Sequence, residues 1–359
     1  MHHGLFMMPM HLPEKPLAQA FDEDIDLLIR ADTLGYGEAW IGEHFTSAWE
    51  SIPAPDLLIA RLVPHIQRMW LGTGVVLLQF HHPVLVANRL AYLDHLSKGR
   101  LYFGFGSGGL PTDSKLFGVP MDGRARAMTR ESVEIILKVW TEEPPFEYHG
   151  DYWHVVAVPP DPKSGLGIYV KPYQKPHPPI AVAGTNVESG TLQIAGERGW
   201  IPMSSSQMPI EGLTSHWHSV ELGAQRTGRT PDRRQWRVAR QIHVAETTAE
   251  ARRDVLEGVM ARAHQDYLYQ GMKTSGRLSV LKTDPRMPDA AVNAEFLLER
   301  NWIAGDPDEC AGKIRELYEK VGGFGHLLML VYDWEPRQKM LTSLELLANE
   351  VMPKLNDLS

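Results

Sequence analysis

Cysteine is nearly absent from this sequence: Cys310 is the single one among 359 residues. It has no partner for an internal disulfide, which suits a reducing cytoplasm. No stretch concentrates Lys or Arg and the net charge is −8, so a nucleic-acid backbone is not an expected partner. No apolar run approaches the roughly 20 residues that cross a bilayer, and the Met-His-His-Gly-Leu start lacks the basic segment of a signal peptide. We therefore expect a soluble cytoplasmic protein without a membrane partner.

Patterns that mark several common hydrolase sites are also missing. The His2-His3 pair precedes the first predicted strand, whereas a barrel metallohydrolase would carry His-x-His just after it. His216 and His218 are two residues apart on a predicted helix and therefore do not share a face. The chain has no Gly-x-Ser-x-Gly elbow, and Cys310 has the pattern of first-turn helix packing. These absences argue against a metal site and against a serine or cysteine nucleophile.

Apolar runs of strand length alternate with amphipathic helical patterns along most of the chain. Such alternation predicts βα units and a parallel sheet. Predicted helices include residues 17–34, 123–140 and 338–351, with Gly35 ending the first of them. Eight candidate strands in series favour a closed (β/α)8 TIM barrel of the α/β class, and they lie at residues 4–9, 38–42, 70–78, 100–106, 180–183, 200–203, 238–244 and 327–331.

Three insertions interrupt this alternation within what we interpret as a single domain of residues 1–359. Residues 107–121 are a detour before the helix at 123–140, and residues 145–173 carry the Pro, Gly and aromatic residues typical of a β-hairpin excursion. Residues 261–294 mix polar residues with tyrosines and prolines and have no clean period. Long irregular insertions in compact domains are usually functional lids or disordered, and we interpret this one as an active-site lid.

A charged pair, Glu43-His44, ends the second predicted strand. The carboxyl ends of barrel strands are where α/β barrels keep their chemistry, and histidine titrates near neutrality and can donate or accept a hydrogen bond. His44 is therefore a candidate catalytic residue, with the alternative that it is satisfied by its neighbours and only caps the next loop. Asp113, in the loop after the fourth strand, either orients a cofactor or substrate or is merely solvated.

Glycines gather in the third and fourth predicted strands. Gly74, between Thr73 and Val75, stands in a buried strand, where glycine costs stability unless a backbone or a flat ligand must come close. Gly106 and Ser107 belong to a Gly-rich segment whose small side chains leave room for a ring system. This segment is not a dinucleotide fingerprint, because no helix begins directly after it. The alternative for the strand glycines is that they relieve crowding in the barrel.

Hydroxyl residues and glycines follow the fifth predicted strand and precede a helix. Free N–H groups and the positive end of the helix dipole make such a place an anion site, although an ordinary N-cap is the alternative. A carboxylate at Glu188 would repel a phosphate unless it points away. The candidate anion-binding residues are Gly184, Thr185, Ser189, Gly190 and Thr191.

Several segments together resemble the bacterial luciferase-like, flavin-dependent monooxygenases. In chain order they are residues 38–44 (EAWIGEH), 71–75 (LGTGV) with His82-Pro83, 96–100 (LSKGR) leading into Phe103-Gly104, Phe117-Gly118, 149–153 (HGDYW), 195–199 (AGERG) and Gly305-Asp306-Pro307. The likeness covers nearly the whole chain and keeps its order. Residues 44–53 (HFTSAWESIP) and 321–325 (VGGFG) are most similar to the branch that includes the diketocamphane and limonene monooxygenases.

The resemblance implies a homodimeric barrel that takes reduced FMN from a separate NAD(P)H-dependent flavin reductase. It puts His44 beside the flavin C4a locus, a non-proline cis peptide at Gly74-Val75 under the isoalloxazine, and the phosphate in the loop after the fifth strand. The chain departs from luciferase at Gly106 and Ser107, where that protein has a cysteine and a phosphate-binding arginine. This departure puts light emission and the position of the phosphate anchor in question.

The function implied by the resemblance is an FMNH2-dependent monooxygenase with O2 as co-substrate. A flavin C4a-(hydro)peroxide would insert one oxygen atom into a small apolar substrate, a terpene or cyclic ketone, by Baeyer–Villiger, epoxidation or hydroxylation chemistry. Two alternatives stay open: an F420-dependent hydride-transfer oxidoreductase on the same barrel, and a non-catalytic flavin-binding protein. The candidate substrate-pocket residues, for which plain core is the alternative, are Phe6, Met8, Phe45, Trp49, Phe80 and Trp302.

Overall fold

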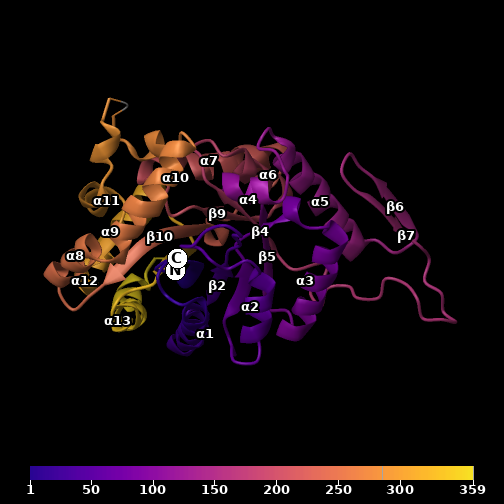
Figure 1. The fold of residues 1–359 in the computed structure, drawn as a ribbon, viewed down its shortest axis with the longest axis horizontal. Coiled ribbons are helices and arrows are strands. Elements are labelled where there is room, and N and C mark those ends of the chain that lie inside the picture. Colours follow the sequence, from indigo (N-terminus) through magenta and orange to yellow (C-terminus); the bar gives the residue numbers. More distant parts are fainter. Residues whose placement is uncertain (285, 359) are drawn as a thin grey trace.

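A closed barrel of parallel strands forms the centre of the molecule (Figure 1). The computed structural model describes residues 1–284 and 286–358. Neighbouring strands pair in parallel around the ring, and pairing of β9 with β10 closes it. The predicted (β/α)8 TIM barrel is confirmed. Its strands are β1 (His2–Met10), β2 (Glu38–Ile41), β3 (Trp70–Thr73), β5 (Leu101–Gly106), β8 (Ile180–Gly184), β9 (Ile201–Ser204), β10 (Arg237–Val244) and β12 (His326–Tyr332).

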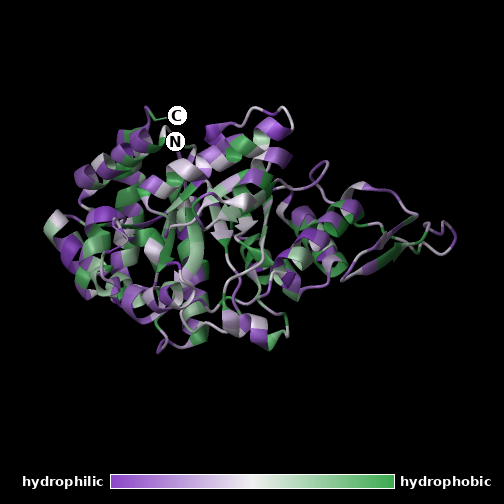
Figure 2. Ribbon diagram, turned by 90° about the horizontal axis from the view of Figure 1, so that it is seen from above, coloured by the Kyte–Doolittle hydropathy of each residue, from purple (hydrophilic) through white to green (hydrophobic). Residues whose placement is uncertain are grey.

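Helices surround the barrel, with apolar positions toward the strands and polar faces outward (Figure 2). In α1 the residues Leu27, Leu28 and Ala31 are buried, and Gly35 ends the helix in the left-handed region at φ +92°. No helix in the described part of the chain is long and apolar enough to span a bilayer. The surrounding helices are α1 (Leu17–Leu34), α2 (Pro55–Leu62), α3 (Pro83–Ser97), α5 (Arg124–Thr141), α6 (Gly190–Arg198), α7 (Ile210–Arg226), α8 (Thr248–Glu257), α12 (Pro307–Val321) and α13 (Gln338–Leu346).

The third predicted strand is interrupted. β3 ends at Thr73, the Gly74–Val75 peptide bond is cis, and the chain continues as β4 (Val76–Leu77) and a 3-10 turn (Leu78–Phe80). The cis bond is at the position that the resemblance implies. Two short elements, α4 (Pro111–Leu116) and β11 (Ile303–Gly305), have no counterpart among the predicted elements. Segments of six and three residues are too short to give a periodic pattern.

The predicted insertions contain regular structure. Residues 145–173 hold an antiparallel hairpin that projects from the barrel (Figures 1 and 2). Residues 261–294 were expected to be irregular, and this is wrong because they are largely helical. A π-helical turn adds a residue and shifts the buried face, which removes the period from the sequence. The elements are β6 (Phe146–His149), β7 (His154–Ala157), α9 (Val259–Ala263), the π-helical turn His264–Leu268, α10 (Tyr269–Thr274), 3-10 turns Leu278–Leu281 and Asp289–Ala291, and α11 (Ala294–Arg300).

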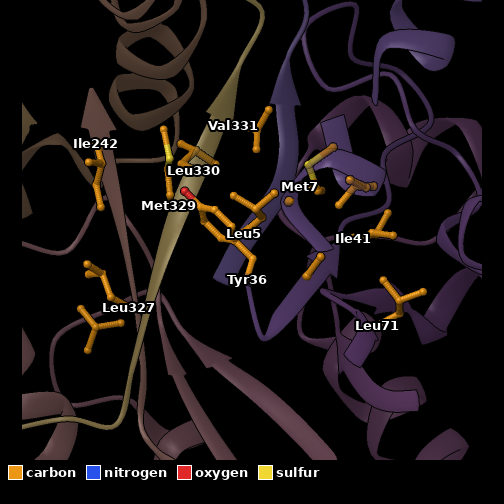
Figure 3. Close-up of a cluster of buried hydrophobic side chains, with 14 of the residues drawn as sticks. Leu5, Met7, Tyr36, Ile41, Leu71, Ile242, Leu327, Met329, Leu330 and Val331 are labelled. Carbon is orange, nitrogen blue, oxygen red and sulfur yellow. The ribbon is translucent and has the colours of Figure 1, made fainter. Parts of the chain in front are cut away.

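Alternate residues of β1 face opposite sides of the barrel wall. Leu5 and Met7 are fully buried in the cluster between strands and helices, where Ile41 and Leu71 of neighbouring strands join them (Figure 3). Phe6, by contrast with its fully buried neighbours, also packs against the cluster inside the barrel and lines the cavity at its mouth. This alternation is what directs the even-numbered residues of β1 toward the mouth of the barrel.

Aromatic rings fill the inside of the barrel. Trp40 stacks on Tyr102 with ring centroids 5.0 Å apart. A Cβ on Gly72 would lie 2.6 Å from the Trp40 ring, and one on Gly104 would lie 2.1 Å from the carbonyl oxygen of Thr73. The glycines at these two positions therefore relieve crowding in the barrel, as the alternative for the strand glycines predicts.

Candidate active site

A cavity of about 600 Å³ lies at the carboxyl ends of the barrel strands. This volume is typical of sites for small molecules and cofactors. The helical insertion covers it, because residues between 266 and 280 form one of its walls. Its lining includes Phe6, Met8 and Met10 of β1, His44, Glu50, Gly74, Val75, residues 108–111, Ala183 and Thr185, residues 203–207, and Tyr267, Leu268, Met272 and Arg277 of the insertion.

His44 lines the cavity between two carboxylates. Its Nδ1 is 3.4 Å from Asp113 Oδ2, and its Nε2 is 3.4 Å from Glu50 Oε2. Burial lowers the pKa of the imidazole, but the charges of Glu50 and Asp113 outweigh burial, and the pKa of His44 is raised above its usual value. The two carboxylates therefore favour the imidazolium over the neutral ring.

Asp113 orients the His44 ring from its Nδ1 side. The residue lies in α4 and is 1% exposed, so the alternative of a solvated side chain is wrong. Its carboxylate also accepts hydrogen bonds from the Phe45 N–H at 3.3 Å and from the Thr46 hydroxyl. Burial raises the carboxyl pKa, but the hydrogen bonds from His44 and Thr46 outweigh it and lower the pKa of Asp113. Asp113 thus stays ionised beside the ring.

Glu50 and Tyr267 complete the surroundings of His44, and neither was predicted. Glu50 is almost fully buried, and the Tyr267 hydroxyl donates a hydrogen bond to its Oε2. Tyr267 also stacks on Trp49, with ring centroids 6.4 Å apart. Glu50 follows His44 in the same loop, a position that could have indicated it. Tyr267 comes from a distant insertion, and nothing in the sequence connects it to this loop.

Glu43 fixes the loop that carries His44. Its carboxylate accepts a hydrogen bond from the Leu77 N–H at 2.6 Å and lies 2.8 Å from Nε2 of His81. Leu77 follows the cis peptide segment, so Glu43 joins the end of β2 to that segment. The buried charge next to His44 is therefore satisfied by backbone and imidazole partners.

The predicted cofactor residues of the third and fourth strands divide into two groups. Gly74 and Val75 line the cavity. Thr73 is fully buried, and its hydroxyl donates to the Gly104 carbonyl at 2.7 Å and accepts from the Gly104 N–H at 2.9 Å. A Cβ on Gly106 would lie 2.9 Å from the Val75 side chain. The predicted residues that support the wall without lining the cavity are Thr73, Gly106 and Ser107.

The loop predicted to bind an anion contributes little to the cavity. Thr185 lines it, but Ser189 is the N-cap of α6 and accepts from the Leu192 N–H at 3.3 Å. A Cβ on Gly184 would lie 2.6 Å from the Leu192 side chain, so this glycine allows α6 to pack closely. Ser189 therefore makes the hydrogen bond of an ordinary N-cap, and anion binding by this loop stays a prediction. The predicted residues outside the cavity lining are Gly184, Ser189, Gly190 and Thr191.

Arg277 also lines the cavity, and the sequence did not predict it. Its Nε donates to Ser275 Oγ at 3.1 Å, and within the described ranges no carboxylate lies within 4 Å of its guanidinium. Burial lowers the pKa of Arg277. Val280 lines both this cavity and an adjoining one that Val187 shares, so the segment lies beside the loop after β8. A guanidinium without a counter-ion, close to hydroxyls, has the chemistry of a phosphate site.

Two of the six predicted pocket residues, Phe6 and Met8, line the cavity. The other four do not line it: Trp49 and Trp302 are buried in the core, and the half-buried Phe45 and Phe80 rings pack against Phe117. Their contact with a substrate stays a prediction. Trp302, for example, is 3% exposed and meets His264 edge to face, with ring centroids 6.0 Å apart. An aromatic residue in an apolar pattern is equally compatible with core and with a pocket wall. The four residues outside the lining are Phe45, Trp49, Phe80 and Trp302.

Comparison with known proteins finds relatives that match nearly the whole chain. The luciferase-like monooxygenase family matches residues 1–323. A 4-hydroxyprotoasukamycin monooxygenase of Streptomyces nodosus subsp. asukaensis is 35% identical, over 98% of this chain and 92% of that protein. A limonene 1,2-monooxygenase of Rhodococcus erythropolis is 33% identical, over 98% of this chain and 86% of that protein. The oxygenating constituent of 3,6-diketocamphane monooxygenase from Pseudomonas putida, a type II Baeyer–Villiger monooxygenase in complex with FMN, has a TM-score of 0.90 at 31% identity, covering 99% and 98% of the two chains.

Proposed function

The chain belongs to the luciferase-like monooxygenase family, and from this premise we propose that it uses reduced FMN to insert one atom of O2 into a small apolar substrate. The observation that carries the proposal is the largely apolar cavity at the barrel mouth, with the His44 imidazole held between two carboxylates at its wall. Relatives that act on limonene and on diketocamphane support a terpene or cyclic ketone as the substrate class.

The residues of the cavity suit FMN. Gly74 presents backbone without a side chain to the cavity beside Val75, which leaves space for a flat ring system. Arg277 and Thr185 would hold the phosphate, because a guanidinium without a carboxylate partner among the described residues lines the same cavity as a hydroxyl. Reduced FMN, when bound, supplies the two electrons that activate O2.

Three tasks fall to the side chains of the chain itself. His44, whose pKa is raised by the neighbouring carboxylates, would carry a positive charge on the cavity wall and stabilise negative charge that develops during oxygen transfer. Asp113 keeps the ring oriented from Nδ1. Leu268 and Met272 of the insertion exclude water from the covered cavity, which prevents wasteful side reactions.

We propose that a separate NAD(P)H-dependent flavin reductase supplies the reduced FMN. The similar Pseudomonas putida protein is an oxygenating constituent, which supports a two-component arrangement. A homodimer is proposed on the family resemblance.

Rapid mixing of the protein, loaded with reduced FMN, with isotopically labelled O2 tests the proposal on a panel of terpenes and cyclic ketones. We expect one labelled oxygen atom per product molecule. A lactone, an epoxide or an alcohol as product distinguishes Baeyer–Villiger insertion, epoxidation and hydroxylation. Product formation without O2 would instead indicate hydride transfer, as in the F420 alternative. Bound flavin without turnover of any panel member would favour a flavin-binding protein.

Arg277→Gln is expected to weaken FMN binding by about 10- to 100-fold and to leave riboflavin binding unchanged. Hydrogen bonds from a charged donor contribute about 1.5–3 kcal/mol, and riboflavin has no phosphate to receive them. Flavin fluorescence titrations with the two ligands measure both affinities.

Arg286→Gln is the matched control, because Arg286 belongs to the same insertion but is 91% exposed and paired with Asp284. It should bind FMN as the unaltered chain does. Equal losses of FMN and riboflavin binding in Arg277→Gln would contradict a phosphate contact.

A further inference from the structure

Tyr267 makes a polar contact that links the insertion to the surroundings of His44. Tyr267 lies in the π-helical turn His264–Leu268 between α9 and α10. A π-helical turn adds one residue to the helix and redirects its side chains, and such turns are frequent at functional sites. Here the redirected ring stacks on Trp49 and its hydroxyl reaches Glu50.

Glu50 stands between Tyr267 and His44. Its Oε2 accepts the Tyr267 hydrogen bond and lies 3.4 Å from His44 Nε2. Since Glu50 is almost fully buried, little water screens its charge from the imidazole. Burial and the charge of Glu50 raise the pKa of Tyr267, so the phenol keeps its proton and acts as a donor to the carboxylate.

We propose that Tyr267 is a positioning residue for His44: by donating to Glu50 it holds that carboxylate against the imidazole, and it thereby couples the placement of the insertion to the protonation of His44. The acidic groups that face His44 are Glu43, Glu50 and Asp113. Glu43 is held by Leu77 and His81, and Asp113 by Phe45 and Thr46. Of these three carboxylates, Glu50 is the one that the insertion holds.

The charge of His44 would therefore depend on whether the insertion at residues 261–294 covers the cavity. While the insertion lies over the barrel mouth, His44 has a carboxylate on each side and the imidazolium is favoured. Displacement of Tyr267 removes the donor from Glu50, which can then turn toward water, and the ring keeps Asp113 as its remaining close partner. A role of this coupling in catalysis rests on the proposed function. It would mean that His44 is protonated preferentially while the insertion covers the cavity.

Histidine-selective NMR titration of the cofactor-free protein measures the pKa of His44 without flavin or substrate. Glu50→Gln is expected to lower it by about one unit, because an opposite charge beside the ring is removed. Tyr267→Phe keeps the ring on Trp49 and should lower it by a smaller amount. The pKa of His44 in the double variant should be no lower than in Glu50→Gln alone, since Tyr267 acts through Glu50. An unchanged or raised pKa in Tyr267→Phe would overturn the proposal.

Tyr269→Phe is the matched control. Tyr269 is half-buried in the same insertion and packs against His264, with ring centroids 5.9 Å apart. We expect this variant to leave the pKa of His44 unchanged and to unfold at the same temperature as Tyr267→Phe. If Tyr269→Phe lowered the pKa of His44 as much as Tyr267→Phe does, the proposal would be overturned, because the effect would then come from a general loosening of the insertion. A fall confined to Tyr267→Phe in a protein without monooxygenase turnover would reject the proposed function and keep the positioning role.

Discussion

His44→Ala is expected to bind FMN as tightly as the unaltered chain and to lower the yield of product per flavin oxidised by about 100-fold or more. A positioned proton donor contributes about 10²–10⁴-fold in such reactions, and alanine removes the group whose pKa Glu50 and Asp113 hold above its usual value. Gly74, Val75 and Arg277, which we propose to hold the cofactor, are unchanged in this variant. Product and hydrogen peroxide, measured together after a single turnover of pre-reduced FMN, give the yield.

His82→Ala serves as the control for this experiment. His82 is exposed before α3 and packs against Trp153, with ring centroids 5.0 Å apart. Its yield should match that of the unaltered chain. A full yield from His44→Ala would remove His44 from the chemistry, and loss of FMN binding in that variant would assign it to cofactor binding.

Arg237→Met is expected to lower the free energy of unfolding by about 3–5 kcal/mol, because it leaves the buried Glu38 carboxylate without its main partner. Arg237 Nη2 is 3.0 Å from Glu38 Oε2, and His326 Nδ1 is 3.0 Å from Glu38 Oε1. The three residues begin β10, β2 and β12, so they close the barrel at the end opposite the cavity. Urea unfolding followed by circular dichroism measures the loss.

Glu38 also makes the stability of the fold depend on pH. Burial would raise the pKa of Glu38, but His326 and Arg237 outweigh burial and lower it from 4.5 to about 2. A carboxyl whose pKa is lower in the folded state stabilises the fold above its unfolded pKa, and this contribution is lost as the pH falls toward the folded pKa. The unfolding free energy should therefore decline between about pH 4.5 and pH 2, more steeply than in Glu38→Gln.

Arg252→Met is the control for the buried pair, since Arg252 forms an exposed ion pair with Glu299. Exposed pairs contribute little to stability, so this variant should unfold nearly as the unaltered chain does. A loss in Arg237→Met no larger than that in Arg252→Met would contradict a stabilising role for the buried group.

The fold was predictable because its signals are local. Alternating apolar and polar periods indicated the barrel strands, and Gly35 marked the end of α1 through its left-handed conformation. The insertion at 261–294 was misjudged because its π-helical turn changes the helical period partway. β11 and α4 are too short for a period to be visible.

The candidate site was predictable only in part. His44 was indicated by its place after β2, and Asp113 by its place after β5. The contact between Glu50 and Tyr267 and the approach of Arg277 depend on how the insertion folds over the barrel, which no spacing in the sequence encodes. Ser189 was assigned to an anion, although its hydroxyl caps α6, because an N-cap and an anion site use the same residue types.

A crystal structure of the protein with bound FMN would show directly whether the flavin lies in the cavity beside His44. We expect the isoalloxazine ring against Gly74 and Val75 with its reactive edge beside His44, and the phosphate at Arg277. FMN bound outside this cavity, or with its ring far from the imidazole, would show that the barrel mouth is not the flavin site.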